Sequence, residues 1–346
     1  MTTPKYKIPL SAHGDTLRAA YLLLDAINVT EEGDTHGFEP YMPPGHFWAI
    51  RVLTAVLTLL GLGLNALALV SILKFFYHFS VSCRFVINLL LTNLLFSAVV
   101  LCRLTLGLVP KVAHSRALCL GFFSAMMCTG STAQLSLLLA LLDNFVTVVF
   151  PFRYRSILTC RAAHVAIAVV WFYSVGAMVV LPNLSAFNDW RSSLACRFNQ
   201  VIARSFRTFM AVQFGVVTLV LVGLYVKVLV VAMGHHRKMM RQADHLSEEE
   251  KEKIRDRCSN VQCKGLMVLC FFVCWLPLCI VQAVESLLAP VPLTVVLNYA
   301  TLFIVLNSAA NPVVCVWRNR HFRMAVKSLL GLKDSTETIN ITIMSA

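Results

Sequence analysis

Residues 52–73 read VLTAVLTLLGLGLNALALVSIL, a run without any charged residue. A helix needs roughly 20 mainly apolar residues to cross a bilayer, so this run is long enough. Comparable charge-free runs follow at 85–102, 117–142, 162–188, 208–226, 265–284 and, after two prolines, 293–317. These runs are continuously apolar, whereas membrane-spanning strands alternate in polarity. The sequence therefore predicts an all-α membrane protein, a bundle of seven transmembrane helices.

The composition supports a chain whose main solvent is lipid. Of its 346 residues, 58% are apolar and 14% are charged, and the mean hydropathy is +0.73. Soluble domains average about 45–50% apolar and about 25% charged residues. A soluble fold of this size could not cover so much apolar surface.

The charge balance predicts the orientation of the bundle. The chain has 30 Lys and Arg residues against 17 Asp and Glu, a net charge of +13. With residues 1–51 outside, most of the basic residues fall on the cytoplasmic side, as the positive-inside rule requires. No basic stripe carries interleaved aromatic side chains, so we expect no nucleic-acid partner. The prediction is a multi-pass protein with an extracellular N-terminus.

Four segments are expected along the chain: an extracellular tail (1–46), the transmembrane bundle (47–317), a short amphipathic eighth helix (318–330) and a cytoplasmic tail (331–346). The extracellular tail has no apolar stretch long enough for a signal peptide. Its sequon at Asn28 would be accessible to glycosylation. The mixed charges of 233–264 are either a solvated helix surface or a contact surface for a cytoplasmic partner.

Most of the 12 cysteines fall inside the apolar runs, where cysteine acts as a small apolar residue. Cys119 opens the third run on the outer side, and Cys196 lies in the external loop 183–203. Both face an oxidising compartment, so a disulfide between them is predicted. Cys258 and Cys263 lack a second ligand pair, so we expect no zinc site and no cofactor.

Several motifs occur in a fixed order on these runs. They are Asn65 in the first run, Asp143-Asn144-Phe145 in the third, Trp171 in the fourth, Phe271 with CWLP at 274–277 in the sixth, and Asn311-Pro312 in the seventh. Over residues 50–330 this pattern resembles the rhodopsin-like (class A) G-protein-coupled receptors. The resemblance implies a plasma-membrane receptor that transduces an extracellular signal to a heterotrimeric G protein and is not an enzyme. Membrane lipid would surround the bundle.

The resemblance also implies a set of activation switches. They are Asn93, Asp143, Asn144, Tyr225, Phe271, Trp275, Pro277, Asn311, Pro312 and Cys315. Pro277 and Pro312 remove backbone donors inside helices and so create kinks. Trp275 lies below the expected pocket, where it either reports on what fills the pocket or simply packs.

Several switch positions depart from the family pattern. Asn93 replaces an aspartate and Ala133 a serine of the family's sodium site, so we expect no bound sodium. Asn144 replaces the arginine of the family's DRY motif, and an amide cannot form its forked, charge-assisted contacts. Cys315 replaces the NPxxY tyrosine that would meet Tyr225, and Val217 the fifth-span proline. Three outcomes stay open: weak coupling, signalling without a ligand, or action as a decoy or trafficking partner.

Four amides fall at lipid depth, where an unpaired polar group is costly. Asn65, Asn93, Asn307 and Asn311 form either one inward polar cluster or separately satisfied amides.

The outer half of the bundle is the expected ligand pocket. Its lining is predicted to comprise Met126, Met127, Gly130, Phe198, Phe209, Gln213, Leu278, Cys279, Gln282, Thr301, Val305 and Arg103. The position where amine receptors carry an aspartate is Met126, so an amine ligand is not expected. Arg103 either marks a functional site or snorkels to the interface.

The ligand class is left open among an unknown small or lipid-like molecule (apolar or anionic), a purine, a peptide, or no agonist at all. The sixth run is similar to that of adenosine receptors, with Gln282 at the position of their purine-binding asparagine and Phe198 at that of their stacking phenylalanine.

The sequence does not favour a transporter, a channel or a membrane enzyme. A transporter or channel would need paired charges at mid-depth, but Asp143, Lys227, Arg103 and Glu285 fall at the ends of the runs. A membrane enzyme would need a metal or nucleophile motif, which the sequence lacks.

Overall fold

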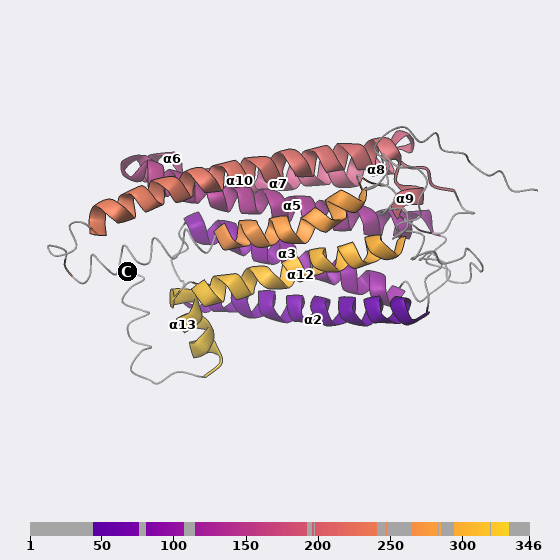
Figure 1. Ribbon diagram of the computed structural model, residues 1–346, viewed down its shortest axis with the longest axis horizontal. Helices are drawn as coiled ribbons and strands as arrows, with labels where there is room; N and C mark the ends of the chain where they lie inside the picture. Colours follow the sequence, from indigo (N-terminus) through magenta and orange to yellow (C-terminus); the bar gives the residue numbers. More distant parts are fainter. Residues whose placement is uncertain are drawn as a thin grey trace, which may run out of the picture.

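The computed structural model describes residues 44–75, 81–106, 115–191, 196, 198–240, 247, 265–282, 284, 294–318 and 320–331. Seven helices in these segments are long and apolar enough to cross a membrane. Figure 1 shows them lying side by side along the longest axis of the molecule. The predicted seven-helix bundle is confirmed.

The long helices are α2 (Pro44–Phe75), α3 (Val81–Leu106), α5 (Arg116–Val149), α7 (Cys160–Val175), α10 (Arg204–Met240), the helix Gly265–Gln282 and α12 (Thr294–Arg318). Short elements are η1 (Pro151–Arg153), α6 (Tyr154–Ile157), η2 (Gly176–Val180), α8 (Leu181–Asn183), η3 (Ser185–Phe187), α9 (Phe198–Val201) and α13 (Arg320–Leu329).

The fourth span is continuous from α7 through η2 into α8. It begins at Thr159, whose side-chain oxygen accepts from the Ala162 amide at 3.1 Å and so caps the helix. Near its end Pro182 has no N–H for the carbonyl of Met178. The chain widens there to a π-helical turn, in which the Leu181 amide donates to the Gly176 carbonyl five residues back.

The distribution of side chains is that of a protein in lipid. Large apolar side chains such as Val169, Phe172 and Leu219 point outward and are more than half exposed. Polar side chains such as Asn65 and Gln134 are completely buried. Because lipid cannot hydrogen-bond to polar groups, these side chains must find partners inside the bundle.

Small and polar residues set the spacing of the helices. A Cβ on Gly61 would lie 3.1 Å from the Ser97 hydroxyl, so glycine allows α2 to approach α3. Asn88 on α3 donates to the Ser136 hydroxyl of α5 at 2.6 Å and accepts from Trp171 of α7 at 3.0 Å. One buried amide thus joins three helices.

The expected amphipathic eighth helix is α13, which turns away from the end of α12 (Figure 1). Ala325 and Val326 are buried, whereas Arg323 and Lys327 are exposed. The helix ends before Gly331, whose positive φ of 67° is typical of a helix C-terminus. The other segment boundaries stay predictions, and residues 1–43 with Asn28 lie outside the described residues.

Candidate ligand pocket and switch region

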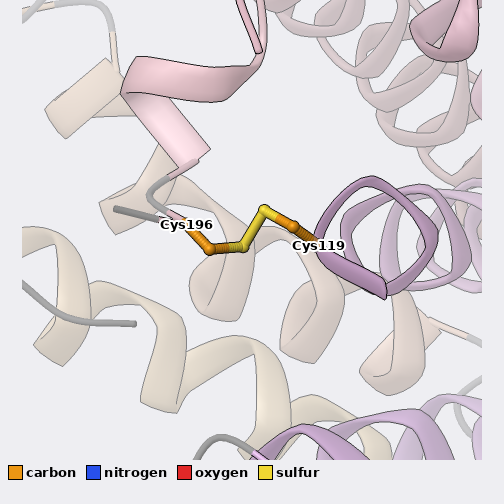
Figure 2. The surroundings of a disulfide bond; sticks show 2 residues. All are labelled: Cys119 and Cys196. Atoms are coloured by element: carbon orange, nitrogen blue, oxygen red, sulfur yellow. A yellow bond between two sulfur atoms is a disulfide. The ribbon is translucent and has the colours of Figure 1, made fainter. Parts of the chain in front are cut away.

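A disulfide fixes the loop between the fourth and fifth spans to the bundle. Cys119, near the start of α5, is bonded to Cys196, with Cα atoms 5.8 Å apart (Figure 2). Both residues are fully buried. The backbone amide of Asp189 donates to the Val201 carbonyl at 2.9 Å, which joins the two arms of the loop. The predicted disulfide is confirmed.

Aromatic rings gather where this loop meets the bundle. Phe198 of α9 lies edge-on to Phe123 of α5, with ring centroids 5.4 Å apart. The guanidinium carbon of Arg103 lies 5.4 Å from the centroid of the same Phe123 ring. The fold thus brings Arg103 and Phe198 together on Phe123. The sequence analysis missed Phe123, although it lies one helical turn before Met126 and Met127.

Trp275 lies between two aromatic rings deeper in the bundle. It stacks on Phe214 of α10 at 4.5 Å and on Phe271 of its own helix at 5.4 Å. A Cβ on Gly130 would lie 3.0 Å from Cη2 of Trp275, so the indole fits closely against a glycine of α5. Phe214 was also missed, because nothing in the sequence shows which face of α10 meets the sixth span.

A second group of expected lining residues shares one apolar cluster. Met126, Leu278 and Trp275 pack against the buried residues Phe96 and Val305. This cluster joins α3, α5, the helix Gly265–Gln282 and α12. It forms a soft apolar wall that packs against Trp275 of the aromatic stack.

Other expected lining residues are not brought into this wall. Phe209 is 39% exposed and lies beside Phe206, with ring centroids 5.8 Å apart. The Thr301 hydroxyl donates to the Asn298 carbonyl of its own helix at 2.7 Å. Met127 is buried in the main core, and Gln282 is half-buried at the end of its helix. Gln213 contacts Gln134, its Nε2 lying 3.5 Å from the Gln134 Oε1.

The four amides at lipid depth are all buried, with exposed fractions of 4% or less. The Asn65 Nδ2 donates to the Gly61 carbonyl at 2.7 Å and to the Ser308 carbonyl at 2.9 Å. The Ser308 hydroxyl donates to the Asn93 carbonyl at 3.3 Å and lies 3.2 Å from the Ser97 hydroxyl.

The hydrogen bonds between helices in this group therefore go to backbone carbonyls or join serine hydroxyls. Several amide atoms have no hydrogen-bond partner among the described residues: Oδ1 of Asn65, Asn307 and Asn311, and Nδ2 of Asn93. Buried polar atoms of this kind are usually bonded to ordered water.

Asp143 is completely buried near the C-terminal end of α5. Its carboxylate accepts hydrogen bonds from the hydroxyls of Ser82 on α3 and Tyr154 on α6, the latter at 2.9 Å. Burial raises the pKa of Tyr154 to about 12, and the adjacent Asp143 charge acts in the same direction. Tyr154 therefore remains a hydrogen-bond donor at neutral pH. Asn144, the next residue, is also buried.

Two of the expected switch residues are prolines inside helices. Pro277 is half-buried inside the helix Gly265–Gln282, and Pro312 is buried inside α12. The side chain of Cys315 lies outside the described part of the chain.

Residues 64–314 match the family model described as 7 transmembrane receptor (rhodopsin family). The chain belongs to this family. Its members are receptors rather than enzymes, and this receptor is a multi-pass membrane protein.

Individual relatives of the receptor are distant. The Alpha-1A adrenergic receptor of Oryzias latipes is 24% identical over 322 residues, which cover 82% of this chain and 67% of the relative. Adenosine receptor A2b of Mus musculus is 25% identical over 224 residues, which cover 57% of this chain and 64% of the relative. Trace amine-associated receptor 5 of Rattus norvegicus is 27% identical over 209 residues, which cover 58% of this chain and 61% of the relative. The last two matches span less than two thirds of the relatives' own lengths.

Proposed function

We propose that the protein is a plasma-membrane receptor that binds a small, mainly apolar ligand and couples weakly to heterotrimeric G proteins. Its N-terminus lies outside the cell, because this orientation leaves most basic residues on the cytoplasmic side. The observation that carries the proposal is the pairing of Asp143 with two hydroxyl groups, in a motif where Asn144 stands at the arginine position.

The weak coupling follows from the chemistry of this motif. An arginine has five N–H donors and a permanent charge, so it can pair with the neighbouring aspartate or reach a G protein. Asn144 has neither the charge nor the length. Ser82 and Tyr154 instead satisfy the Asp143 carboxylate, so the resting contact of this region does not depend on an arginine.

The proposed ligand class follows from the pocket wall. Met126, Leu278 and Val305 offer soft apolar contact to a ligand entering from outside. An amine ligand, as the names of two relatives suggest, would need an acidic partner, and Met126 stands at that position in this chain. Arg103 over the Phe123 ring could meet an anionic group at the rim.

A purine is a second ligand class. One relative is named an adenosine receptor, and Phe198, a predicted lining residue, lies edge-on to Phe123. Displacement of a radiolabelled purine from membranes that contain the receptor would favour this class over a lipid-like ligand.

The absence of sodium binding is part of the same proposal. The buried amides around Asn93 are neutral, so they would hold a cation only through carbonyl oxygens, without a carboxylate. Thermal stability that does not change between sodium and potassium buffers would agree with this.

The proposal is tested by basal signalling in cells with and without the receptor, at matched surface expression. Cyclic-nucleotide and calcium levels close to those of control cells support weak coupling. A large ligand-free signal would show constitutive activity instead. No signal with any G protein, even for ligand-bound receptor, would leave a decoy or trafficking role.

A further inference from the structure

Gln134 is a fully buried polar side chain where α5 faces α10. Its Nε2 donates to the Phe214 carbonyl at 3.0 Å and to the Thr218 hydroxyl at 3.1 Å. Its Oε1 accepts from the Nε2 of Gln213 at 3.5 Å. One side chain of α5 therefore contacts three residues of α10 that span little more than one helical turn.

The hydrogen-bonding capacity of this amide is well matched to α10. A glutamine NH2 group has two donors, and both of them point to α10 acceptors. The Phe214 carbonyl can take the extra bond because an oxygen has two lone pairs. If α10 slides or rotates against α5, these bonds break together, and lipid offers no replacement partners.

These contacts lie beside the aromatic stack, because Gln134 is one helical turn past Gly130, the glycine that packs against Trp275. Phe214, whose carbonyl is held by Gln134, stacks on Trp275 at 4.5 Å. Gln213 was expected to line the pocket, and its Oε1 is buried without a hydrogen-bond partner among the described residues. A change at Gln213 would therefore act directly on Gln134 and, through Phe214, on Trp275.

The sequence of α10 contains no proline that would distort the helix near this contact. No proline interrupts α10 between Arg204 and Met240, and Val217 stands at the position of the family's proline. A proline would remove a backbone hydrogen bond and distort the helix. In this chain α10 is uninterrupted, and a side chain from α5 provides the local constraint.

We propose that Gln134 is a positioning residue that clamps α10 onto α5 and thereby holds the Phe214–Trp275 stack in its resting place. The clamp itself depends only on the packing of the bundle. Its effect on signalling rests on the proposed receptor function.

Hydrogen–deuterium exchange of the purified full-length receptor tests the clamp. In Gln134→Leu, amides of α10 around residues 213–222 should exchange about tenfold faster, because local opening no longer breaks the interhelical bonds. Thr218→Val removes one of the contacts and should give a smaller increase. The double variant should exchange like Gln134→Leu alone, since the Thr218 contact is already lost.

Ser131→Ala is the matched control. Ser131 lies almost one turn earlier on α5, is equally buried, and its hydroxyl has no partner among the described residues. Its substitution should leave α10 exchange unchanged. Equal acceleration in Ser131→Ala and Gln134→Leu, or no acceleration in Gln134→Leu, would overturn the clamp. If Gln134→Leu does not fold, wild-type exchange in Thr218→Val would overturn it as well.

Nucleotide exchange on added G protein separates the two proposals. If the clamp holds the resting state of a coupled receptor, Gln134→Leu should also raise this rate. Faster α10 exchange without any change in nucleotide exchange would keep the clamp and overturn its effect on signalling.

Discussion

The ring of Tyr225 on α10 lies directly against the backbone of Gly265, at the start of the sixth span. A Cβ placed on Gly265 would lie 2.1 Å from the ring atoms Cε2 and Cζ and 2.2 Å from the hydroxyl oxygen. No side chain fits in this space while the ring stays in place. The absence of a Cβ on Gly265 therefore allows the Tyr225 ring of α10 to lie against the sixth span.

Gly265→Ala should displace the Tyr225 ring and destabilise the resting bundle. Overpacking of this kind typically costs about 1–3 kcal/mol. Thermal unfolding in detergent would measure the loss. In a Tyr225→Ala background the same substitution should have almost no further effect, because the ring that it displaces is gone.

Gly223→Ala on α10 serves as the control for this pair. A Cβ there meets no atom within 4 Å, so the change should be neutral or slightly stabilising, given the better helix propensity of alanine. Equal losses of stability in Gly223→Ala and Gly265→Ala would show that the contact between Tyr225 and Gly265 is not the cause. The same conclusion would follow if the Tyr225→Ala/Gly265→Ala double variant lost as much stability as its two single variants combined.

Tyr154→Phe should loosen α6 from α5 by removing the hydrogen bond to Asp143. A bond of this type contributes about 1 kcal/mol, and Tyr154 is only half-buried, so a small loss in thermal stability is expected. Because the folded state raises the pKa of the phenol from 10.0 to about 12, this contribution is complete below pH 10. It is lost as the pH rises from 10 towards 12.

The stability difference between wild type and Tyr154→Phe should therefore be constant between pH 7 and 9 and shrink above pH 10. A difference that already disappears between pH 7 and 9 would contradict the bond to Asp143. Ser156→Ala, which removes an exposed hydroxyl bonded to the Arg153 carbonyl, is a control on the same short helix.

Asn144→Arg combined with Cys315→Tyr should increase G-protein activation. The pair restores the charged, forked donor and the tyrosine at the two positions where the family carries them. Nucleotide exchange on purified G protein in membranes should rise several-fold above that of the wild-type receptor. Asn144→Lys with Cys315→Phe, which keeps charge and ring without the fork and the hydroxyl, should recover less. An unchanged rate in the Arg/Tyr variant would mean that other positions limit coupling.

Cys196→Ser should reduce delivery of the receptor to the cell surface. The disulfide ties the loop that carries Cys196 to α5. Loss of such a bond typically costs about 2–5 kcal/mol in small secreted domains, and we expect a comparable loss here. Surface labelling of an N-terminal tag against total protein measures the delivered fraction. Cys102→Ser, an exposed free cysteine on α3, should traffic like wild type. Full surface delivery of Cys196→Ser would show that the loop folds without its covalent link.

The seven spans and the disulfide could be predicted because each depends on local properties of the chain. The run at 52–73 is apolar over the full length of a bilayer, and both Cys119 and Cys196 fall on one side of the membrane once the spans are counted. The burial of Asn65 and Asn93 follows from the cost of amides in lipid. These inferences need no knowledge of how the helices face one another.

The pairing of side chains across helices was decided only by the tertiary structure. Gln134, Phe214 and Gly265 look ordinary in the sequence, since an apolar run in lipid carries no periodic polar face that would show which side meets a neighbour. Packing rotates α10 so that Phe214 meets Trp275 and Tyr225 meets Gly265. The sequence alone determined that the chain crosses the membrane seven times. The rotation of each helix about its own axis determined which residues contact one another across the bundle, because only the packed bundle brings their donors, acceptors and rings within reach.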